Sequence, residues 1–386
     1  MDHRIYIHGE GMSQPSMRVL LLTEERISFT DALTRGGAIH VRNVARGLGE
    51  RGHDTILIDW NPTAERTWQL SVSPRTRFVD GPLRTLRRAI AVGRTTDINV
   101  IVSKTRKTYL PGLLAARRLG VPHVVHVGSS LERPEAGPLD RLNVASVSAR
   151  LRAPHDAYFV VCEHIAEQLE NSGISADRIY DVKNAVDTDR FHPSTVPVEL
   201  DDEFRAQLPA GPQTLRLGYV GGLQPYKGLA DLAAAMDRMS ADCELIVAGD
   251  GPDRERLERK FGDSATFLGA VPYEQIPALY HEVETFVLPS HTEGLPRVVL
   301  EAQATATPVV ATRVGGVPEV IEDESTGLLC EPRDPSGLAA DLQRLADDSD
   351  LRSRLGDAGR GAVAQSYSWD ALYDRYEEYL AAVVGQ

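Results

Sequence analysis

Short apolar runs alternate with amphipathic stretches along most of the chain. The apolar runs predict buried strands, and the stretches between them have the spacing of helices that pack one face on a sheet. This alternation is typical of βαβ units around parallel sheets. The first half contains the predicted strands Val19–Thr23, Thr55–Asp59, Val100–Ser103, Val124–Val127 and Tyr158–Cys162. The second half contains Leu215–Val220, Leu245–Ala248, Thr266–Leu268, Phe286–Pro289 and Val309–Ala311.

The length of 386 residues exceeds the usual size of one hydrophobic core, so two domains are expected. The region from Phe191 to Pro212 is rich in Pro and acidic residues and has the weak periodicity of a linker. The pattern therefore predicts an α/β fold with two Rossmann-like, doubly wound domains. The predicted parts are a tail at 1–16, a first domain at 17–190, a linker at 191–212, a second domain at 213–366 and a final helix at 367–386.

Glycine pairs follow several of the predicted strands. They are Gly36-Gly37, Gly221-Gly222, Gly249 with Gly251, and Gly315-Gly316. Any single pair is also compatible with an ordinary tight turn. Because doubly wound domains bind ligands at the carboxyl ends of their strands, the four together favour a ligand site lined with backbone amides.

Residues 290–319 contain the most informative pattern in the chain. Glu293 lies on a Gly-bearing turn, Pro296 marks the first turn of a predicted helix, and Glu301 follows about one turn inside it. The free amides and the dipole of such a helix start attract an anion. An anion site between two carboxylates suits a ligand with both phosphate and hydroxyl groups, such as a sugar nucleotide. The alternative for Glu301 is a solvated helix residue, and in either case its removal is expected to leave the stability of the unliganded protein unchanged.

Lys227 follows the glycine turn after the predicted strand Leu215–Val220, and it is one of only five lysines in the chain. A cation at this place can neutralise a pyrophosphate leaving group. A solvated lysine before a helix is the alternative.

These two segments together resemble the donor-site signature of glycosyltransferase family 4, whose members are retaining enzymes of the GT-B fold. The resemblance implies two domains facing across a cleft and a final helix that returns to the first domain. It implies that Glu301 binds ribose, that Glu293 and the amides of Gly294 and Leu295 contact the sugar and phosphate, and that Lys227 binds the diphosphate. It also implies that the Gly36-Gly37 loop closes over the ligands. Arg297 is either a further anion contact or a solvated side chain.

The chain departs from the family pattern at two positions. Gly222 stands where relatives often carry an Arg, so backbone amides or an arginine from elsewhere must replace that cation. Gly128 stands where many relatives carry a His at a strand end. His126 lies two residues earlier on the same strand face and is a candidate substitute. A structural histidine is an equally good interpretation of His126.

Metal-binding patterns are weak. Asp187-Thr-Asp189 and Asp348-Ser-Asp350 match the Asp-x-Asp pattern of metal-dependent sugar-nucleotide enzymes, but neither ends a predicted buried strand. We expect both to be structural and expect no metal or other cofactor. The three cysteines are widely spaced and indicate reduced thiols in a cytoplasmic compartment.

Charge divides the chain unevenly. Residues 1–190 carry 26 Lys+Arg against 22 Asp+Glu, a net charge of +4, whereas residues 191–386 carry 16 against 33, a net charge of −17. Arg84, Arg87 and Arg88 lie beside leucines in one helical stretch, and Arg117 and Arg118 end another. This pattern predicts a first domain that faces the inner surface of a membrane or a lipid-linked acceptor. Ordinary solvated helices and a salt-adapted surface are the alternatives.

The sequence thus predicts metal-independent transfer of a sugar from a nucleoside diphosphate sugar to a hydroxyl acceptor in a glycolipid, polysaccharide or glycan precursor. Nucleic acid is not an expected partner. Two other functions remain open, a nucleotide-sugar 2-epimerase of the same fold and a catalytically silent nucleotide-sugar binding subunit.

Overall fold

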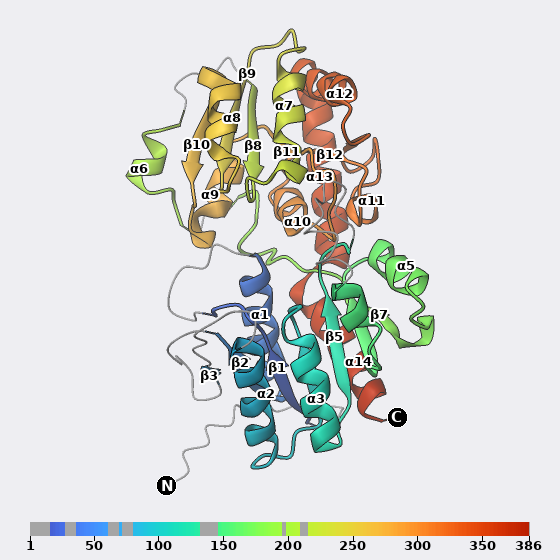
Figure 1. Ribbon diagram of the computed structural model, residues 1–386. Helices are drawn as coiled ribbons and strands as arrows, with labels where there is room; N and C mark the ends of the chain where they lie inside the picture. The colour runs from blue at the N-terminus through green and yellow to red at the C-terminus, as the bar shows by residue number, and fades with distance from the viewer. Residues whose placement is uncertain are drawn as a thin grey trace. The chain divides into compact units, whose positions relative to one another are not determined.

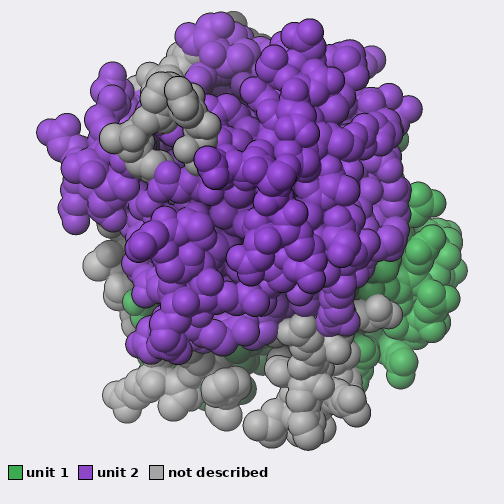
Figure 2. Space-filling model, turned by 90° about the horizontal axis from the view of Figure 1, so that it is seen from above, with its two compact units in different colours: residues 1–131, 138–182, 373–386 green, residues 132–137, 183–372 purple. Residues whose placement is uncertain are grey.

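The computed structural model describes residues 16–27, 36–60, 69–71, 80–131, 146–194, 198–208 and 215–385 (Figure 1). Residues 1–15 of the predicted tail and residues 195–197 and 209–212 of the predicted linker lie outside these residues. The chain forms two compact units (Figure 2). Residues 1–131, 138–182 and 373–386 make the first unit, and residues 132–137 and 183–372 make the second.

The first unit is built on a seven-stranded parallel sheet of order β3-β2-β1-β4-β5-β6-β7. Its strands are β1 Arg18–Leu22, β2 Asp54–Asp59, β3 Gln69–Ser71, β4 Val100–Ser103, β5 His123–Val127, β6 Ala157–Val160 and β7 Ile179–Asp181. Its helices include α1 Gly36–Glu50, α2 Asp80–Gly93, α3 Tyr109–Leu119, α5 Glu163–Asn171 and the short 3₁₀ helix η1 Ala176–Arg178. The central strands are apolar and fully buried because helices cover both faces of a parallel sheet.

The second unit has a six-stranded parallel sheet of order β10-β9-β8-β11-β12-β13. Its strands are β8 Leu215–Val220, β9 Cys243–Ala248, β10 Ala265–Gly269, β11 Thr285–Leu288, β12 Val309–Thr312 and β13 Leu328–Cys330. Its α-helices are α6 Asp202–Arg205, α7 Leu229–Met236, α8 Arg254–Phe261, α9 Ile276–His281, α10 Arg297–Ala304, α11 Val317–Val320, α12 Pro335–Asp347 and α13 Ser349–Ser366. Its 3₁₀ helices are η2 Pro225–Lys227, η3 Gly262–Ser264 and η4 Tyr273–Gln275.

Both sheets reverse their strand order at one place. In the first unit this switch point lies between β1 and β4, and in the second unit it lies between β8 and β11. Ligands of doubly wound sheets bind beyond the carboxyl ends of the strands that flank such a point. The strand order of the second unit therefore predicts a ligand site at the segments that follow β8 and β11.

The predicted α/β fold with two parallel sheets is confirmed, and each of the ten predicted strands overlaps an observed one. The sequence did not indicate β3, β7 and β13. All three are three residues long and lie at sheet edges. An edge strand pairs on one side only, so it needs neither the length nor the continuous apolar run that identifies a central strand. No helix in the described part of the chain is long and apolar enough to cross a membrane.

The final helix, α14 Trp369–Val384, packs on the first unit from Tyr373 onward, as the family resemblance implies. The hydroxyl of Tyr373 donates a hydrogen bond to the Asn43 carbonyl of α1 at 3.0 Å. Arg51 forms ion pairs with Asp374 and Glu377 of α14. A Cβ atom at Gly47 of α1 would overlap the Tyr373 ring, so this glycine lets the two helices meet closely.

Gly47→Ala is therefore expected to destabilise the protein by about 1–3 kcal/mol, because the added methyl displaces Tyr373 from the α1 surface. Gly49→Ala is the matched control, since a Cβ atom there meets nothing within 4 Å. That control should gain about 0.5–1 kcal/mol from the higher helix propensity of Ala. Urea unfolding of the two variants measures both effects. A gain in stability for both would show that α14 does not pack against α1 at this position.

Candidate functional site

Lys227 follows β8 at the switch point of the second unit. The chain turns at Gly221 and Gly222, forms η2 and then enters α7 through Gly228. Gly228 has a φ of +70°, which a residue with a side chain rarely adopts. A Cβ atom there would also overlap the carbonyl of Pro289, just after β11. Gly228 thus allows the segment after β8 to lie directly against the segment after β11.

Glu293 is the partner that this contact brings to Lys227. The Nζ atom of Lys227 lies 2.6 Å from Oε1 of Glu293, and the Ser290 hydroxyl donates to the same oxygen at 2.6 Å. The side chains of Lys227 and Glu293 are 19% and 12% exposed. Lys227 is therefore an ion-paired, largely covered cation, and its alternative interpretation as a solvated lysine is wrong.

The loop that carries Glu293 is fixed by its backbone. Gly316 donates its amide to the Gly294 carbonyl at 2.7 Å, and Asn184 donates its side-chain amide to the Leu295 carbonyl at 2.6 Å. Gly315 has a φ of +54°, and a Cβ atom on it would overlap the backbone of Glu293. Both carbonyls of the Gly294-Leu295 pair are therefore hydrogen-bonded within the second unit.

Helix α10 begins directly after this loop. It starts at Arg297, and Pro296 precedes it in an extended conformation instead of lying in its first turn as the sequence predicted. Pro296 has no amide hydrogen to donate. The amides of Leu295 and Arg297 lie on either side of Pro296 at the positive end of the helix.

Glu301 is buried inside α10 and is only 4% exposed, so the interpretation of it as a solvated helix residue is wrong. Its carboxylate pairs with Arg297 at 3.2 Å and accepts a hydrogen bond from the Tyr280 hydroxyl at 3.4 Å. Burial raises the pKa of Glu301 to about 7, although Arg297 and the hydroxyls of Tyr273 and Tyr280 oppose this shift. Removal of Glu301 would leave the Arg297 guanidinium without this partner. The expectation that such a change leaves stability unaltered is therefore corrected.

Arg297 is likewise not the solvated side chain that one interpretation of the sequence allowed. Its side chain is 9% exposed, and it donates to the Tyr273 hydroxyl at 3.0 Å as well as pairing with Glu301. Its guanidinium also lies 5.7 Å from the centre of the Tyr273 ring. Arg297 thus holds a carboxylate and an aromatic ring in place beneath the helix start.

Gly222 lies beside the amide of Gln224. A Cβ atom at Gly222 would lie 2.6 Å from Oε1 and 2.8 Å from Nε2 of Gln224. The neutral amide of Gln224 therefore occupies the space that a longer side chain at position 222 would enter.

His126 lies in β5 of the first unit and is buried. Its Nδ1 atom is 3.1 Å from the Tyr376 hydroxyl, which accepts a hydrogen bond from Lys104 Nζ at 2.6 Å. A Cβ atom at Gly128 would lie 3.2 Å from His126 Nε2, so the imidazole of His126 reaches toward Gly128. Burial, aided by the nearby charge of Lys104, holds the pKa of His126 well below its usual value. His126 is thus a neutral imidazole at neutral pH.

Gly37 lies in the first turn of α1, after the segment that follows β1. A Cβ atom there would make an ordinary contact with Glu25 at 3.5 Å. The structure thus groups Gly222, Lys227, Glu293, Gly294, Leu295, Arg297 and Glu301 in the second unit, and it places Gly37 and His126 in the first.

Several residues of the site were not indicated by the sequence. Ser290 binds Glu293, Asn184 holds the Leu295 carbonyl, and Tyr273 and Tyr280 line the Glu301 carboxylate. Ser290 carried a local signal, because it follows a buried strand directly and precedes Glu293 by three residues. The others come from distant segments whose contacts with the site depend on tertiary structure.

The Asp-x-Asp segments have structural partners. Asp348 caps α13 by accepting the Leu351 amide at 2.8 Å, and Asp187 accepts the Arg190 amide at 3.0 Å. Within the described residues, no group of three or more His, Cys, Asp or Glu side chains could hold a metal ion.

Comparison with known proteins identifies the family of the chain. The family model for glycosyl transferases group 1 matches residues 201–362, and the model for glycosyltransferase family 4 matches residues 34–190. A D-inositol 3-phosphate glycosyltransferase of Saccharomonospora viridis is 32% identical over 312 residues, which cover 71% of this chain and 68% of the relative. The alpha-maltose-1-phosphate synthase of Mycolicibacterium smegmatis is 27% identical over 95% of this chain and 100% of its own.

Solved structures share the same arrangement of the chain. Sucrose-phosphate synthase from Thermosynechococcus elongatus matches with a TM-score of 0.80 at 22% identity, over 95% of this chain and 100% of that one. Anabaena HepE in complex with UDP-glucose matches with a TM-score of 0.78 at 18% identity, over 95% of this chain and 100% of that one. The chain therefore belongs to the group 1 glycosyltransferases of family 4 and has their two-domain GT-B fold.

Proposed function

We propose that this glycosyltransferase moves a sugar from a nucleoside diphosphate sugar to a hydroxyl group, with retention of the anomeric configuration and without a metal ion. The observation that carries this proposal is the 2.6 Å contact between Lys227 and Glu293 at the switch point of the second sheet. A cation suits a phosphate group, and a carboxylate suits the hydroxyls of a sugar. Because the two lie side by side, they suit a ligand in which phosphate and sugar are directly bonded.

The leaving group in this reaction is the nucleoside diphosphate. The bond between the anomeric carbon and the phosphate oxygen breaks, and a bond between the anomeric carbon and the acceptor oxygen forms. The acceptor proton passes to the leaving phosphate. Lys227 and the amides at the start of α10 offset the negative charge that develops on that phosphate. Glu293 holds the sugar hydroxyls, and Lys227 exchanges its contact with Glu293 for the phosphate when the donor binds.

Glu301 is the proposed contact for the ribose. An ionised carboxylate accepts hydrogen bonds from both hydroxyls of a vicinal diol. Its pKa of about 7 means that this acceptor form is only half populated in the unliganded protein near neutral pH.

The donor and the acceptor follow from different observations. The likeness to a structure with bound UDP-glucose makes UDP and its sugar conjugates the first donors to test. The basic character of residues 1–190 supports a hydroxyl on a lipid-linked or membrane-associated acceptor. Retention is tested by proton NMR of the product, whose anomeric configuration must match that of the donor.

Lys227→Ala is expected to lower turnover by roughly 10²-fold or more, because the leaving diphosphate loses its main cation. Lys260→Ala is the matched control, since Lys260 is an exposed lysine of α8 in the same unit, and its turnover should equal that of wild type. Release of nucleoside diphosphate from the best donor of a UDP-, GDP- and ADP-sugar panel provides the readout. EDTA should leave the wild-type rate unchanged. Loss of activity with EDTA and its recovery with Mn²⁺ would contradict the metal-free mechanism.

Nucleotide affinity should rise with pH as Glu301 ionises, if Glu301 binds the ribose. With a pKa of about 7, roughly a tenth of Glu301 is ionised at pH 6 and most of it at pH 8. The dissociation constant of UDP should therefore fall about tenfold more between these pH values for wild type than for Glu301→Gln. Isothermal titration calorimetry measures both, and the variant corrects for titration of the phosphate itself. Equal pH dependence of UDP affinity in the two proteins would show that Glu301 does not bind the ribose.

Unfolding of the unliganded proteins tests the pKa separately. A raised pKa means that the folded state binds more protons than the unfolded state between pH 4.5 and about 7. The stability of wild type relative to Glu301→Gln should therefore be highest below pH 4.5. It should fall by about 3 kcal/mol as the pH rises through 7. A relative stability that does not change with pH would show that Glu301 is ionised throughout this range.

A further inference from the structure

The outer face of helices α2 and α3 in the first unit exposes leucines among arginines. Leu83 of α2 is 48% exposed, and Leu110 and Leu114 of α3 are 46% and 44% exposed. Among the described residues, only one other large hydrophobic side chain, Val198, is exposed to this degree. Single exposed leucines are ordinary, but three on two neighbouring helices form a surface suited to an apolar partner.

The spacing of these residues places each set on one side of its helix. In α3, Leu110, Leu114, Arg117 and Arg118 follow one another at intervals of four, three and one residues and are all exposed. The opposite side of α3 is buried in the unit. In α2, Leu83 and Arg87 are four residues apart and are also both exposed. We call this combined surface of Leu83, Arg87, Arg88, Leu110, Leu114, Arg117 and Arg118 the α2–α3 face.

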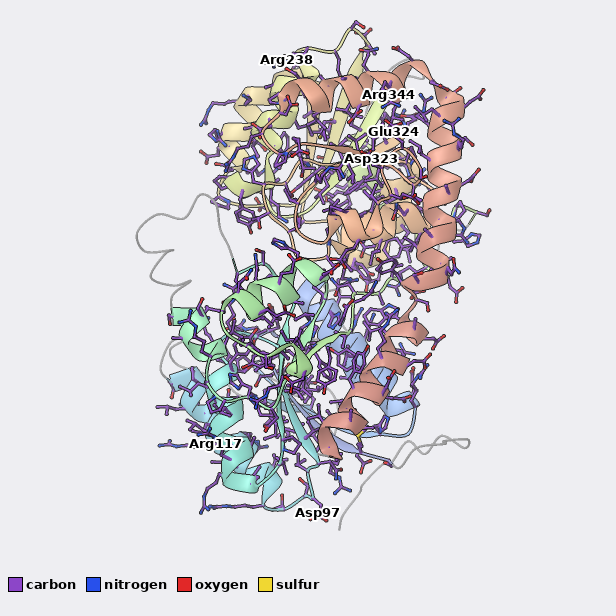
Figure 3. All side chains as sticks on the ribbon, turned by 90° about the vertical axis from the view of Figure 1, so that its right-hand side faces the viewer. Asp97, Arg117, Arg238, Asp323, Glu324 and Arg344 are labelled. Atoms are coloured by element: carbon purple, nitrogen blue, oxygen red, sulfur yellow. The ribbon has the colours of Figure 1, made fainter. Side chains whose placement is uncertain are left out.

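The two helices are neighbours and run in the same direction (Figure 1). A Cβ atom at Gly93, the last residue of α2, would overlap Leu119, the last residue of α3, so their ends lie side by side. Arg117 points outward from α3, away from the strands (Figure 3). The exposed leucines and arginines of these two helices therefore lie on neighbouring parts of the surface of the first unit.

The sequence around this face is strongly basic. Residues 80–120 contain nine Lys and Arg against two acidic residues, Asp80 and Asp97. Asp80 is paired with Arg84 at 2.8 Å. Arg87, Arg88, Arg117 and Arg118 are exposed and so present their charge to the surroundings of the protein. An apolar strip beside a cluster of cations is complementary to an interface that is apolar within and anionic at its surface.

The leucines of the α2–α3 face lie near the end of the first sheet at which the proposed acceptor would bind. Helix α3 begins shortly after β4 ends. Leu110 lies in the first turn of α3 and is therefore near the carboxyl ends of the strands. Leu83 lies in the first turn of α2. Because α2 and α3 are parallel and end side by side, Leu83 lies at about the same height along the helices as Leu110. Both leucines are thus close to the carboxyl ends of the strands, where ligands of doubly wound sheets bind.

We propose that the α2–α3 face docks on an anionic lipid bilayer, with its leucines entering the acyl boundary and its arginines contacting the lipid phosphates. Long Arg side chains suit this placement because their stems lie along apolar material while the charge stays in water. The enzyme would then take its acceptor from the plane of the membrane. This docking is separate from turnover, and vesicle binding tests it whether or not the proposed transfer reaction is correct.

Co-sedimentation of the full chain with phosphatidylglycerol vesicles and with phosphatidylcholine vesicles tests the proposal. Wild type should pellet with the anionic vesicles at low salt and much less with the neutral ones. Each near-surface cation contributes about 1 kcal/mol, so loss of two corresponds to roughly 30-fold weaker binding. Arg117→Glu/Arg118→Glu should therefore bind at least that much more weakly. Arg238→Glu, a reversal of an exposed arginine in the second unit, should bind as wild type does.

The leucines have a matched control of their own. Leu110→Gln/Leu114→Gln should weaken binding to anionic vesicles at both low and high salt, because it removes the apolar contribution that salt does not screen. Val198→Gln changes a residue of similar exposure in the second unit and should have no effect. Circular dichroism confirms that each variant is folded.

Three results would overturn the proposal. The first is a failure of wild type to pellet with phosphatidylglycerol vesicles at low salt. The second is wild-type binding by both the arginine and the leucine variants. The third is a wild-type dimer in gel filtration that the leucine variant converts to a monomer with unchanged vesicle binding, which would make this face a contact between two copies of the chain.

Discussion

Close contact between backbones at two glycines underlies the candidate site. Gly228 lies against Pro289, and Gly315 lies against Glu293, at distances that any side chain would prevent. These contacts join the segments after β8, β11 and β12 into one rigid group of loops. The Lys227–Glu293 pair is their consequence, because they bring the end of η2, which carries Lys227, against the loop that carries Glu293. A substitution at either glycine would therefore change the site without touching a charged residue.

The site contains two ion pairs that differ in exposure and hence in what they can do. Lys227 and Glu293 retain some contact with solvent, so a phosphate or a sugar hydroxyl can reach both partners. Arg297 and Glu301 are almost fully buried, and separating them would leave an uncompensated charge in the interior. The first pair suits exchange with a ligand. The second fixes the start of α10. Burial raises the pKa of Glu301 in this pair to about 7, although Arg297 opposes the shift.

The sequence predicted the central strands and the donor-site segments because both leave local signals. Buried parallel strands such as β4 and β11 are continuous apolar runs, and the Glu293 to Glu301 segment carries its spacing in the chain itself. Edge strands such as β13 have no such signal. The burial of Glu301 was also hidden, since Tyr273 and Tyr280 reach it from segments that precede it by more than twenty residues. Local pattern thus identifies which residues matter, whereas tertiary packing decides their ionisation.

The half of the chain that contains the candidate donor site is strongly acidic. Residues 191–386 carry a net charge of −17, yet the proposed donor is an anion that binds among them. The average field of this half therefore opposes binding, and at physiological salt it is screened beyond about 8 Å. In the mechanism proposed above, attraction comes from groups in direct contact with the phosphate, namely Lys227 and the amides at the start of α10. The basic α2–α3 face belongs to the other unit, so each unit presents cations where its own anionic partner would approach. The uneven charge of the chain is thus consistent with two anionic partners bound in different ways, one by a few short contacts and one by a broad surface.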